Sequence, residues 1–243
     1  MTGLVLRDIC AGYAGVPAIS KISLGCEPGE VLAIIGPNGA GKSTTLLAIA
    51  GALQITSGEI LLDGRSIGNK SADAVARAGV VLIPSDRGIF PGLTVEEHLR
   101  LSEHSPVRSS RAKLSRDQVL DQFPQLRNLT SRRVALLSGG EQQMLAIAKS
   151  LLLSPAVLMV DELSLGLAPK LVADLLPAIA RIARESHMSV IIVEQHYELA
   201  LKVATNGLVM NRGRVVLNAK AAELMHNPEI LEAAYFGEDE RGR

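Results

Sequence analysis

The chain has 243 residues, of which 47% are hydrophobic and only 2% are aromatic, with no Trp. This length suits one large domain or two small ones, and the composition favours an α/β core of Ala, Val, Ile and Leu over an all-β sandwich. Lys plus Arg and Asp plus Glu both number 25, so the formal net charge is zero and no overall basic field predicts binding to nucleic acid or to an anionic membrane.

Other global features point to a cytosolic protein. Cys10 and Cys26 are few and widely spaced, so we expect reduced thiols rather than a disulfide or a metal site. The first residues lack the basic start and long apolar run of a signal peptide. No stretch reaches the roughly 20 apolar residues that span a bilayer. Any membrane role would therefore depend on a partner.

Strands and helices alternate in the first third of the chain. Residues 4–9 predict a strand, and the continuous apolar run of residues 31–35 is typical of a buried one. A glycine-rich loop and a helix over residues 42–50 follow. Residues 58–64 predict a strand with an Asp-Gly turn, and residues 79–83 predict another buried strand, which ends at a proline.

A more polar region then interrupts the pattern. Residues 94–133 predict a helical insertion, and helical patterning resumes over 140–153, so we expect a helical subdomain at about 94–153 inside a single domain of residues 1–243. Buried strands follow at 156–160 and 189–193. Between them a helix is expected over 169–186, which Pro177 should kink or break. Residues 207–210 and 214–217 predict a hairpin, and helices close the chain. Alternating strands and helices indicate a mostly parallel sheet covered on both faces.

The glycine-rich loop fits the phosphate-binding pattern Gly-x-x-x-x-Gly-Lys-Ser. Its residues are Gly36, Pro37, Asn38, Gly39, Ala40, Gly41, Lys42, Ser43 and Thr44. Glycines let successive backbone N–H groups face a phosphate, and the helix N-terminus adds partial positive charge. We expect this phosphate loop (residues 36–44) to bind a nucleoside triphosphate, with Lys42 reaching the β- and γ-phosphates and Ser43 binding Mg²⁺. A glycine-rich turn before an ordinary helix is the alternative, which the flanking strand and helix disfavour.

Two acids follow the strand of residues 156–160. Asp161 is placed to hold Mg²⁺ from the side opposite Ser43, directly or through water. Glu162 diverges from it, so we expect Glu162 to face a water near the γ-phosphate and to act as general base. Alone, such a pair would indicate a solvated strand end, but a phosphate loop upstream favours the catalytic interpretation.

A third motif, Leu-Ser-Gly-Gly-Glu-Gln at residues 137–142, lies between the phosphate loop and the acidic pair. The three in this order resemble the ATP-binding cassette of ABC transporters. The resemblance implies an α/β fold: a P-loop NTPase (RecA-like) core with a mostly parallel sheet, an N-terminal antiparallel β-subdomain and a helical insertion. In that family Ser138, Gly139 and Gly140 contact the γ-phosphate of ATP held by the opposite subunit, so hydrolysis should require a dimer.

Other residues match the family's pattern. Tyr13 lies where the family stacks an aromatic ring on adenine, although a purely structural tyrosine is the alternative. Residues 164–169 match the family's dimer-contact loop. Residues 138–148, 164–169 and 193–195 look like those of ATPase subunits of branched-chain amino acid importers, and related importers of urea, short amides and other amino acids share them.

Three positions depart from the family's usual residues. Ser85 stands where a Gln usually contacts Mg²⁺ and senses the membrane partner, and Asp86 is an alternative for that role. Leu163 replaces the proline that follows the catalytic Glu. Gln195 occupies the position of a His that contacts the γ-phosphate, and the neighbouring His196 is an equal candidate.

The resemblance implies an energy-coupling ATPase that uses ATP and Mg²⁺ and drives alternating access in membrane permease subunits. Its implied partners are those permease subunits, a second ABC ATPase as homodimer or heterodimer, and indirectly an extracytoplasmic solute-binding protein. No nucleic-acid partner is expected. The implied location is the cytoplasmic face of the inner (plasma) membrane, as a peripheral subunit.

Two other functions remain as hypotheses. A soluble ABC ATPase acting on ribosomes or DNA is disfavoured by the single phosphate loop, the absence of a heptad run and the lack of basic surplus. A weakly hydrolysing regulatory subunit is disfavoured by Lys42, Asp161 and Glu162 together.

Overall fold

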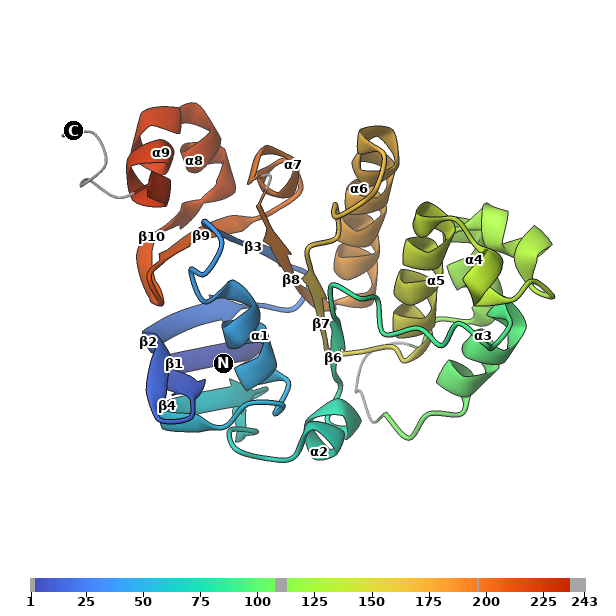
Figure 1. The fold of residues 1–243 in the computed structure, drawn as a ribbon, viewed down its shortest axis with the longest axis horizontal. Coiled ribbons are helices and arrows are strands. Elements are labelled where there is room, and N and C mark those ends of the chain that lie inside the picture. The colour runs from blue at the N-terminus through green and yellow to red at the C-terminus, as the bar shows by residue number, and fades with distance from the viewer. Residues whose placement is uncertain (1–2, 108–112, 196, 237–243) are drawn as a thin grey trace.

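The computed structural model describes residues 3–107, 113–195 and 197–236. Its strands form two sheets (Figure 1). The smaller sheet is antiparallel and has the order β2-β1-β4-β5, with bounds Val16–Cys26, Leu4–Tyr13, Ile55–Leu62 and Arg65–Ser66.

The larger sheet lies at the centre of the molecule. Its order is β10-β9-β3-β8-β7-β6, with bounds Arg214–Lys220, Asn206–Asn211, Val31–Ile35, Ser189–Glu194, Val157–Asp161 and Val80–Ile83. All neighbours pair in parallel except β10, which forms the predicted hairpin with β9. The carboxyl ends of β3, β6, β7 and β8 therefore meet at one edge, which is where ligands bind in sheets of this type.

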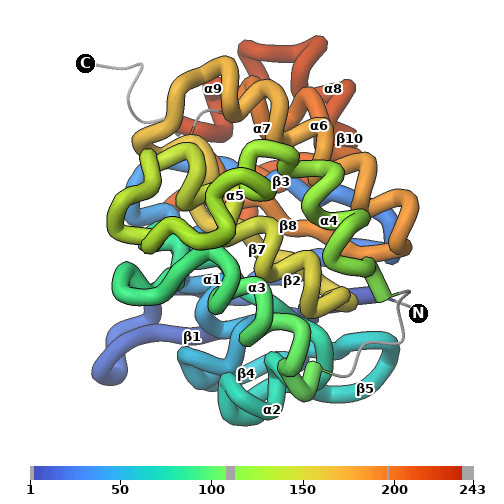
Figure 2. The backbone as a smooth tube through the Cα atoms, turned by 90° about the vertical axis from the view of Figure 1, so that its right-hand side faces the viewer, coloured from blue at the N-terminus to red at the C-terminus, as the bar shows by residue number. Residues whose placement is uncertain are grey.

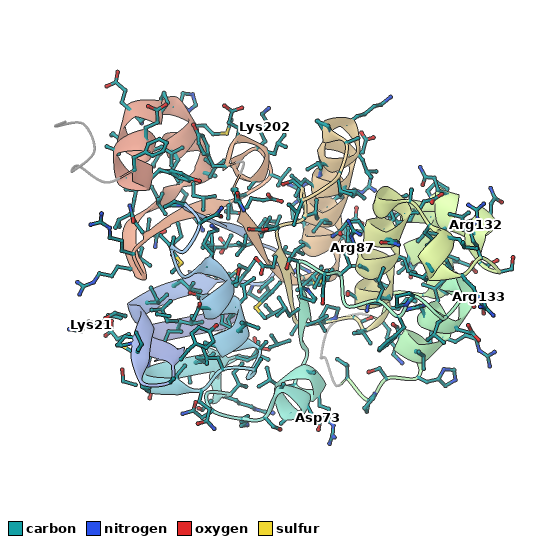
Figure 3. The ribbon with its side chains drawn as sticks, in the orientation of Figure 1. Lys21, Asp73, Arg87, Arg132, Arg133 and Lys202 are labelled. Carbon is teal, nitrogen blue, oxygen red and sulfur yellow. The ribbon has the colours of Figure 1, made fainter. Side chains whose placement is uncertain are left out.

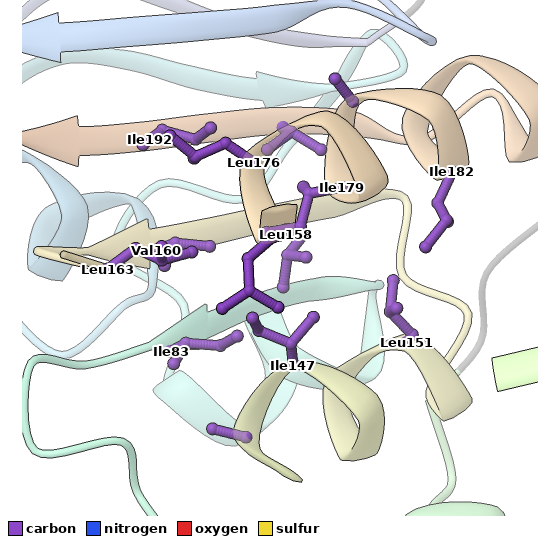
Figure 4. Close-up of a cluster of buried hydrophobic side chains, with 14 of the residues drawn as sticks. Ile83, Ile147, Leu151, Leu158, Val160, Leu163, Leu176, Ile179, Ile182 and Ile192 are labelled. Carbon is purple, nitrogen blue, oxygen red and sulfur yellow. The ribbon is translucent and has the colours of Figure 1, made fainter. Parts of the chain in front are cut away.

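Alternate residues of the central strands enter different cores, because side chains alternate between the faces of a strand. Ala33 and Ile35 pack on the face covered by α5 (Gly139–Leu152) and α6 (Pro169–Ser186). Figure 4 shows side chains of these two helices, such as Ile147 and Ile179, directed toward Leu158 and Val160 of β7. This pattern explains why β3 is apolar at every position.

The opposite face of the central sheet carries the other core. Leu32 and Ile34 pack there against α1 (Lys42–Ile49) and the inner side chains of the antiparallel sheet. Helix α1 contacts both β1 and β2, so it lies between the two sheets. The phosphate loop that begins α1 is thereby fixed from two sides.

The remaining helices surround these layers. They are α2 (Ala72–Arg77), α3 (Val95–Glu103), α4 (Arg116–Gln122), the 3₁₀ helices Pro124–Leu129 and Val134–Leu136, α7 (Tyr197–Leu201), α8 (Ala221–His226) and α9 (Pro228–Phe236). In Figure 2, α3, α4 and α5 lie on the side that faces the viewer. These helices fall within the range 94–153, whose status as a subdomain stays a prediction. None of the described helices is both long and apolar enough to cross a bilayer.

Capping boxes begin all three longer helices of this region. Thr94 with Glu97, Ser115 with Gln118, and Ser138 with Glu141 each exchange hydrogen bonds between side chain and backbone. Such a box satisfies backbone donors that a helix start would otherwise leave free. These polar capping residues thus fix where the helices of this region begin. They also contribute to the polar composition that distinguishes the region from the core.

Of the expected kink or break at Pro177, the break does not occur, because α6 continues as one helix from Pro169 to Ser186. Pro177 lies on the exposed side, and so does Ala173, whose carbonyl loses its helical partner. Water can satisfy that carbonyl, while buried residues on the opposite side, among them Leu176 and Ile179, hold the helix against the sheet. Burial of this apolar face outweighs the missing hydrogen bond.

Candidate active site

The phosphate loop connects β3 to α1, and its shape requires glycine. Gly36, Gly39 and Gly41 have φ angles of 153°, 76° and 95°. A Cβ on Gly36 would lie 2.1 Å from the backbone oxygen of Met210. Gly41 is the N-cap of α1 and supplies no side-chain cap, so no capping side chain covers the N–H groups of the first turn. Free donors at a positive helix end are what a phosphate group needs.

Lys42 is folded over this loop. Its side chain is buried, and its Nζ donates to the backbone oxygens of Gly36 at 2.7 Å and Pro37 at 3.0 Å. Burial lowers the pKa of Lys42, while the charges of Glu162, Asp161 and Glu194 oppose that shift. The ammonium group is therefore held against the loop and is influenced by the acids at the strand ends, as expected for a group that reaches a triphosphate.

Asp161 ends β7, and the side chain of Ser43 in α1 lies near its carboxylate. Burial raises the pKa of Asp161, the nearby Ser43 hydroxyl lowers it, and the negative charge of the neighbouring Glu162 raises it further. Among the described residues, the buried Oδ1 of Asp161 has no hydrogen-bond partner. A carboxylate oxygen left unpaired beside a hydroxyl fits a hard divalent cation such as Mg²⁺, which takes oxygen ligands.

Glu162 follows Asp161 but leaves the strand direction. Its φ angle is 52°, and its N–H donates to the carbonyl of Val193 at 2.9 Å. Gln195 comes from the end of β8, and its Nε2 donates to Oε1 of Glu162 at 2.6 Å. The structure thus brings the predicted base and the predicted γ-phosphate residue into contact. His196, the other candidate, lies outside the described residues.

Glu194 is a site residue that the sequence analysis missed. It is 1% exposed, and its two carboxylate oxygens accept from the N–H and the hydroxyl of Ser164 at 2.8 and 2.6 Å. This pairing fixes the loop that follows Glu162. A charged residue at the end of an otherwise apolar buried strand is the signal that would have identified it.

Residues 138–140, here called the Ser138 tip, begin α5. Oγ of Ser138 accepts from the N–H of Glu141 at 3.3 Å, and Oε2 of Glu141 accepts from the N–H of Ser138 at 2.7 Å. Ser138 is exposed, and a Cβ on Gly140 would lie 2.4 Å from Cδ2 of Leu171, so only glycine fits there without a shift. Helices α5 and α1 cover opposite faces of the central sheet. The action of the tip on a neighbouring molecule stays a prediction.

Tyr13 and Ser85 lie at the rim. Tyr13 ends β1 and is 50% exposed. The following strand reaches the phosphate loop, since a Cβ on Gly41 would lie 2.7 Å from Cγ2 of Ile19. Ser85 is exposed in the turn after β6, and because Ile83 pairs with Val160, this turn follows the strand end next to Asp161.

Comparisons with known proteins agree with this geometry. A family model described as ABC transporter matches residues 19–164. The branched-chain amino acid transport ATP-binding protein BraG of Pseudomonas aeruginosa is 36% identical, over 93% of this chain and 95% of that protein. A probable branched-chain amino acid transport ATP-binding protein, LivF of Archaeoglobus fulgidus, is 33% identical, over 90% of this chain and 93% of that protein.

Solved structures show the same fold. The ADP conformation of MJ1267, an ATP-binding cassette of an ABC transporter, has a TM-score of 0.81 and 25% identity, over 98% of this chain and all of that one. An ATP-binding subunit of an ABC transporter has a TM-score of 0.82 and 25% identity, over 97% and 98% of the two chains. The resemblance and the fold class expected from sequence are confirmed. The chain therefore belongs to the ABC transporter family and is an ATPase with the P-loop NTPase fold of that family's cassettes.

Proposed function

We propose that this ATPase powers the uptake of branched-chain amino acids, or of a related small polar solute such as urea, an amide or another amino acid. The observation that carries the proposal is the convergence of Lys42, Asp161 and Glu162 at one edge of the central sheet, where the parallel strands β3 and β7 flank β8. Relatives that share almost the full length of the chain are named as branched-chain amino acid transport ATP-binding proteins. The DNA or ribosomal alternative gains no support from these relatives.

Each residue of the site has a role in this proposal. The N–H groups of the phosphate loop and the Lys42 ammonium bind the β- and γ-phosphates, and Tyr13 stacks on the adenine ring. Ser43 and Asp161 would hold Mg²⁺, which supplies positive charge to the phosphate oxygens when it is bound. Ser85 or Asp86 lies one strand away as a further candidate ligand.

Glu162 accepts the proton of the attacking water, and Gln195 orients Glu162. The amide of Gln195 donates to one carboxylate oxygen, which leaves the other oxygen free to receive the proton. Because Gln does not titrate, this orienting contact persists across neutral pH, which a histidine would not guarantee. His196 remains the alternative for contact with the γ-phosphate.

The partners follow from the same proposal. The Ser138 tip of one chain closes on the triphosphate held by a second ABC ATPase, either another copy or a similar subunit. Closing and reopening of that pair drives membrane permease subunits at the cytoplasmic face of the inner membrane, and an extracytoplasmic solute-binding protein delivers the solute. Exposed Phe90, which stacks on His98 at a centroid distance of 5.9 Å, offers an apolar contact to such a subunit.

The experiment is ATP hydrolysis by the full chain with Glu162→Gln. Loss of a general base costs about 10²- to 10⁴-fold in rate, while ATP binding through the phosphate loop is retained. Glu59→Gln, which removes an exposed charge paired with Arg7, is the matched control and keeps the parent rate. Unchanged turnover in Glu162→Gln would overturn the assigned base.

The transport arm of the proposal has its own test. We expect the chain to co-purify with permease subunits and to support ATP-dependent uptake of labelled leucine in reconstituted vesicles. Labelled urea and acetamide tested in the same vesicles identify the solute class. ATP hydrolysis without association to any membrane subunit would refute the transport role and leave the ATPase intact.

A further inference from the structure

We infer that Arg87 is a positioning residue that holds the Ser138 tip in its phosphate-binding shape. Arg87 lies in the turn after β6, here called the Arg87 turn (residues 84–88), at the junction of the central sheet with α5 (Figure 3). The inference deepens the proposed function and rests on it, because it assumes that the tip serves the triphosphate of a neighbouring chain.

The backbone of the Arg87 turn is held in a shape that most residues avoid. Arg87 has a φ angle of 69°, and its N–H donates to the carbonyl of Pro84 at 2.8 Å. Gly88 is also left-handed, with φ of 54°, and its N–H donates to Oδ1 of Asp86 at 3.1 Å. A non-glycine residue in this region persists only where its surroundings determine it, and such residues gather at functional sites.

Hydrogen bonds of the Arg87 guanidinium group hold the backbone of the turn in this conformation. Nη1 of Arg87 donates to Oε1 of Gln142 at 2.8 Å, and Nε donates to Oε1 of Gln143 at 3.2 Å. Gln143 is 4% exposed, so its acceptor is fixed inside the protein. Two charge-assisted hydrogen bonds from one rigid planar group define both the position and the orientation of the first turn of α5.

Gln142 passes this restraint to the tip. Its Nε2 donates to the carbonyls of Val134 at 3.1 Å and Leu137 at 3.4 Å, and Leu137 directly precedes Ser138. Its own N–H donates to the carbonyl of Ser138 at 2.9 Å. The guanidinium also lies beside the tip itself, since a Cβ on Gly139 would be 3.5 Å from Nη2 of Arg87. Arg87 therefore restrains the tip through Gln142, whose side chain bonds to Leu137 and whose backbone bonds to Ser138.

A second contact joins the same turn to α5 farther along the helix. Nζ of Lys149 donates to the carbonyl of Gly88. Burial lowers the pKa of Lys149, and the charge of Asp86 opposes that shift. The Arg87 turn is thus attached to α5 at its first and third turns. Because the turn continues from the strand next to Asp161, the tip and the metal-binding edge are joined through it.

The test uses the full chain with Glu162→Gln as parent, because slow turnover preserves the ATP-bound state. Three variants in this background are compared with the parent: Arg87→Ala, Arg87→Lys and the control Arg77→Ala, which breaks an exposed pair with Asp73. ATP-dependent association, with a second copy or with a companion ABC ATPase, is measured by sedimentation. Binding of fluorescent ATP to the single chain is measured in parallel.

We expect association to weaken about tenfold or more in Arg87→Ala, because the two charge-assisted hydrogen bonds that restrain the start of α5 are lost. Arg87→Lys, which keeps the charge but not the planar fork, should fall between Arg87→Ala and the parent. The affinity of the single chain for ATP should stay within about twofold of the parent in the Arg87 variants, which a general loss of structure would not allow. Association of the control variant Arg77→Ala should also stay within about twofold of the parent. Arg87→Ala and Gln142→Leu combined should cost less than the sum of the two single variants, because Gln142 transmits part of the effect of Arg87. Equal association in Arg87→Ala and the parent overturns the inference.

A second measurement separates this inference from the proposed function. Hydrogen exchange of the amides at residues 138–141 is followed in the nucleotide-free chain, where no partner is needed. We expect roughly tenfold faster exchange in Arg87→Ala than in the parent, with unchanged exchange in β3. If the parent never associates on ATP, the proposed function fails while faster exchange still supports the role of Arg87. If exchange at the tip is unchanged, the role of Arg87 fails whatever the parent does.

Discussion

The phosphate loop and the Ser138 tip both present a helix N-terminus, yet the chain holds them in different ways. The loop lies between two sheets, and the side chain of Lys42 donates to the loop carbonyls of Gly36 and Pro37. The tip lies at the exposed start of α5 and is restrained by side chains, chiefly Glu141 and Gln142. We therefore propose that the loop is a complete phosphate-binding surface in one chain, whereas the tip serves a neighbouring chain.

The difference has a thermodynamic counterpart. The charged groups at the loop and strand ends are buried or half-buried, so they cost stability in the absence of ligand. The tip consists of small residues behind a capping box, with Ser138 exposed and the two glycines half-buried, so it contributes ordinary helix-start stability. Substitutions at the phosphate loop and strand ends should therefore weaken ATP binding but raise the stability of the nucleotide-free protein. Substitutions at the Ser138 tip should lower both ATP-dependent association and stability.

The largest effect is expected for Lys42→Ala. Loss of the only loop ammonium should abolish measurable hydrolysis and weaken ATP binding by about a hundredfold, the range for a charge-assisted contact to phosphate. The nucleotide-free protein should melt no earlier than the parent, because a buried cation is removed. Lys70→Ala, at an exposed position, is the control for both measurements. Normal ATP binding by Lys42→Ala would contradict the assignment of the loop.

An intermediate effect is expected for Gly140→Ala. The added Cβ must displace the side chain of Leu171 and adds bulk to the tip that is proposed to meet the γ-phosphate, so ATP-dependent association should fall about tenfold while the single chain binds ATP normally. Gly92→Ala, where a Cβ meets nothing within 4 Å, is the matched control. If Gly140→Ala lost ATP binding by the single chain, the separation of the two regions would be wrong.

A pH effect is expected for Asp161→Asn without nucleotide or metal. The folded-state pKa of Asp161 is raised, so its charge destabilises the folded protein most above that pKa and not at all below the ordinary Asp value. The variant should therefore melt later than the parent at neutral pH, and the difference should shrink as the pH falls through the raised pKa. A constant difference across this range would show that the carboxylate is not destabilised by burial. Thermal melts at a series of pH values measure it.

The smallest effect is expected for Ser138→Ala. Loss of one N-cap should lower the free energy of unfolding by about 1 kcal/mol, measured by denaturant unfolding of the nucleotide-free chain. Ser115→Ala, which removes the cap of α4, should cost a similar amount without changing ATP-dependent association. If Ser138→Ala associated on ATP as well as the parent, the Ser138 hydroxyl would not contact phosphate.

Local signals account for what the sequence predicted well. The phosphate loop needs only a strand, glycines at fixed spacing and a helix, all within residues 31–50, and Asp161 and Glu162 follow directly from a strand end. Contacts between distant segments account for what it missed. Arg87 meets Gln142 across 55 positions, and Glu194 meets Ser164 across 30. Neither residue has a local pattern that announces its partner, so only the fold reveals these two positioning contacts.

Pro177 shows the converse, because the break that a strong local rule allows does not occur there. The rule concerns an isolated helix, in which the lost hydrogen bond and the ring clash decide the outcome. In the folded chain the buried face of α6 decides it, with Leu176 and Ile179 on either side of the proline. Tertiary burial overrides local preference where the affected carbonyl faces solvent.

The central claim is that the phosphate loop of one chain and the Ser138 tip of another enclose one ATP between them. Sedimentation of the Glu162→Gln chain with MgATP, alone and mixed with a companion ABC ATPase, tests this most directly. We predict a stable pair that carries two ATP molecules and separates when nucleotide is removed. A species that binds ATP fully yet keeps the mass of a single chain under both conditions would contradict the account.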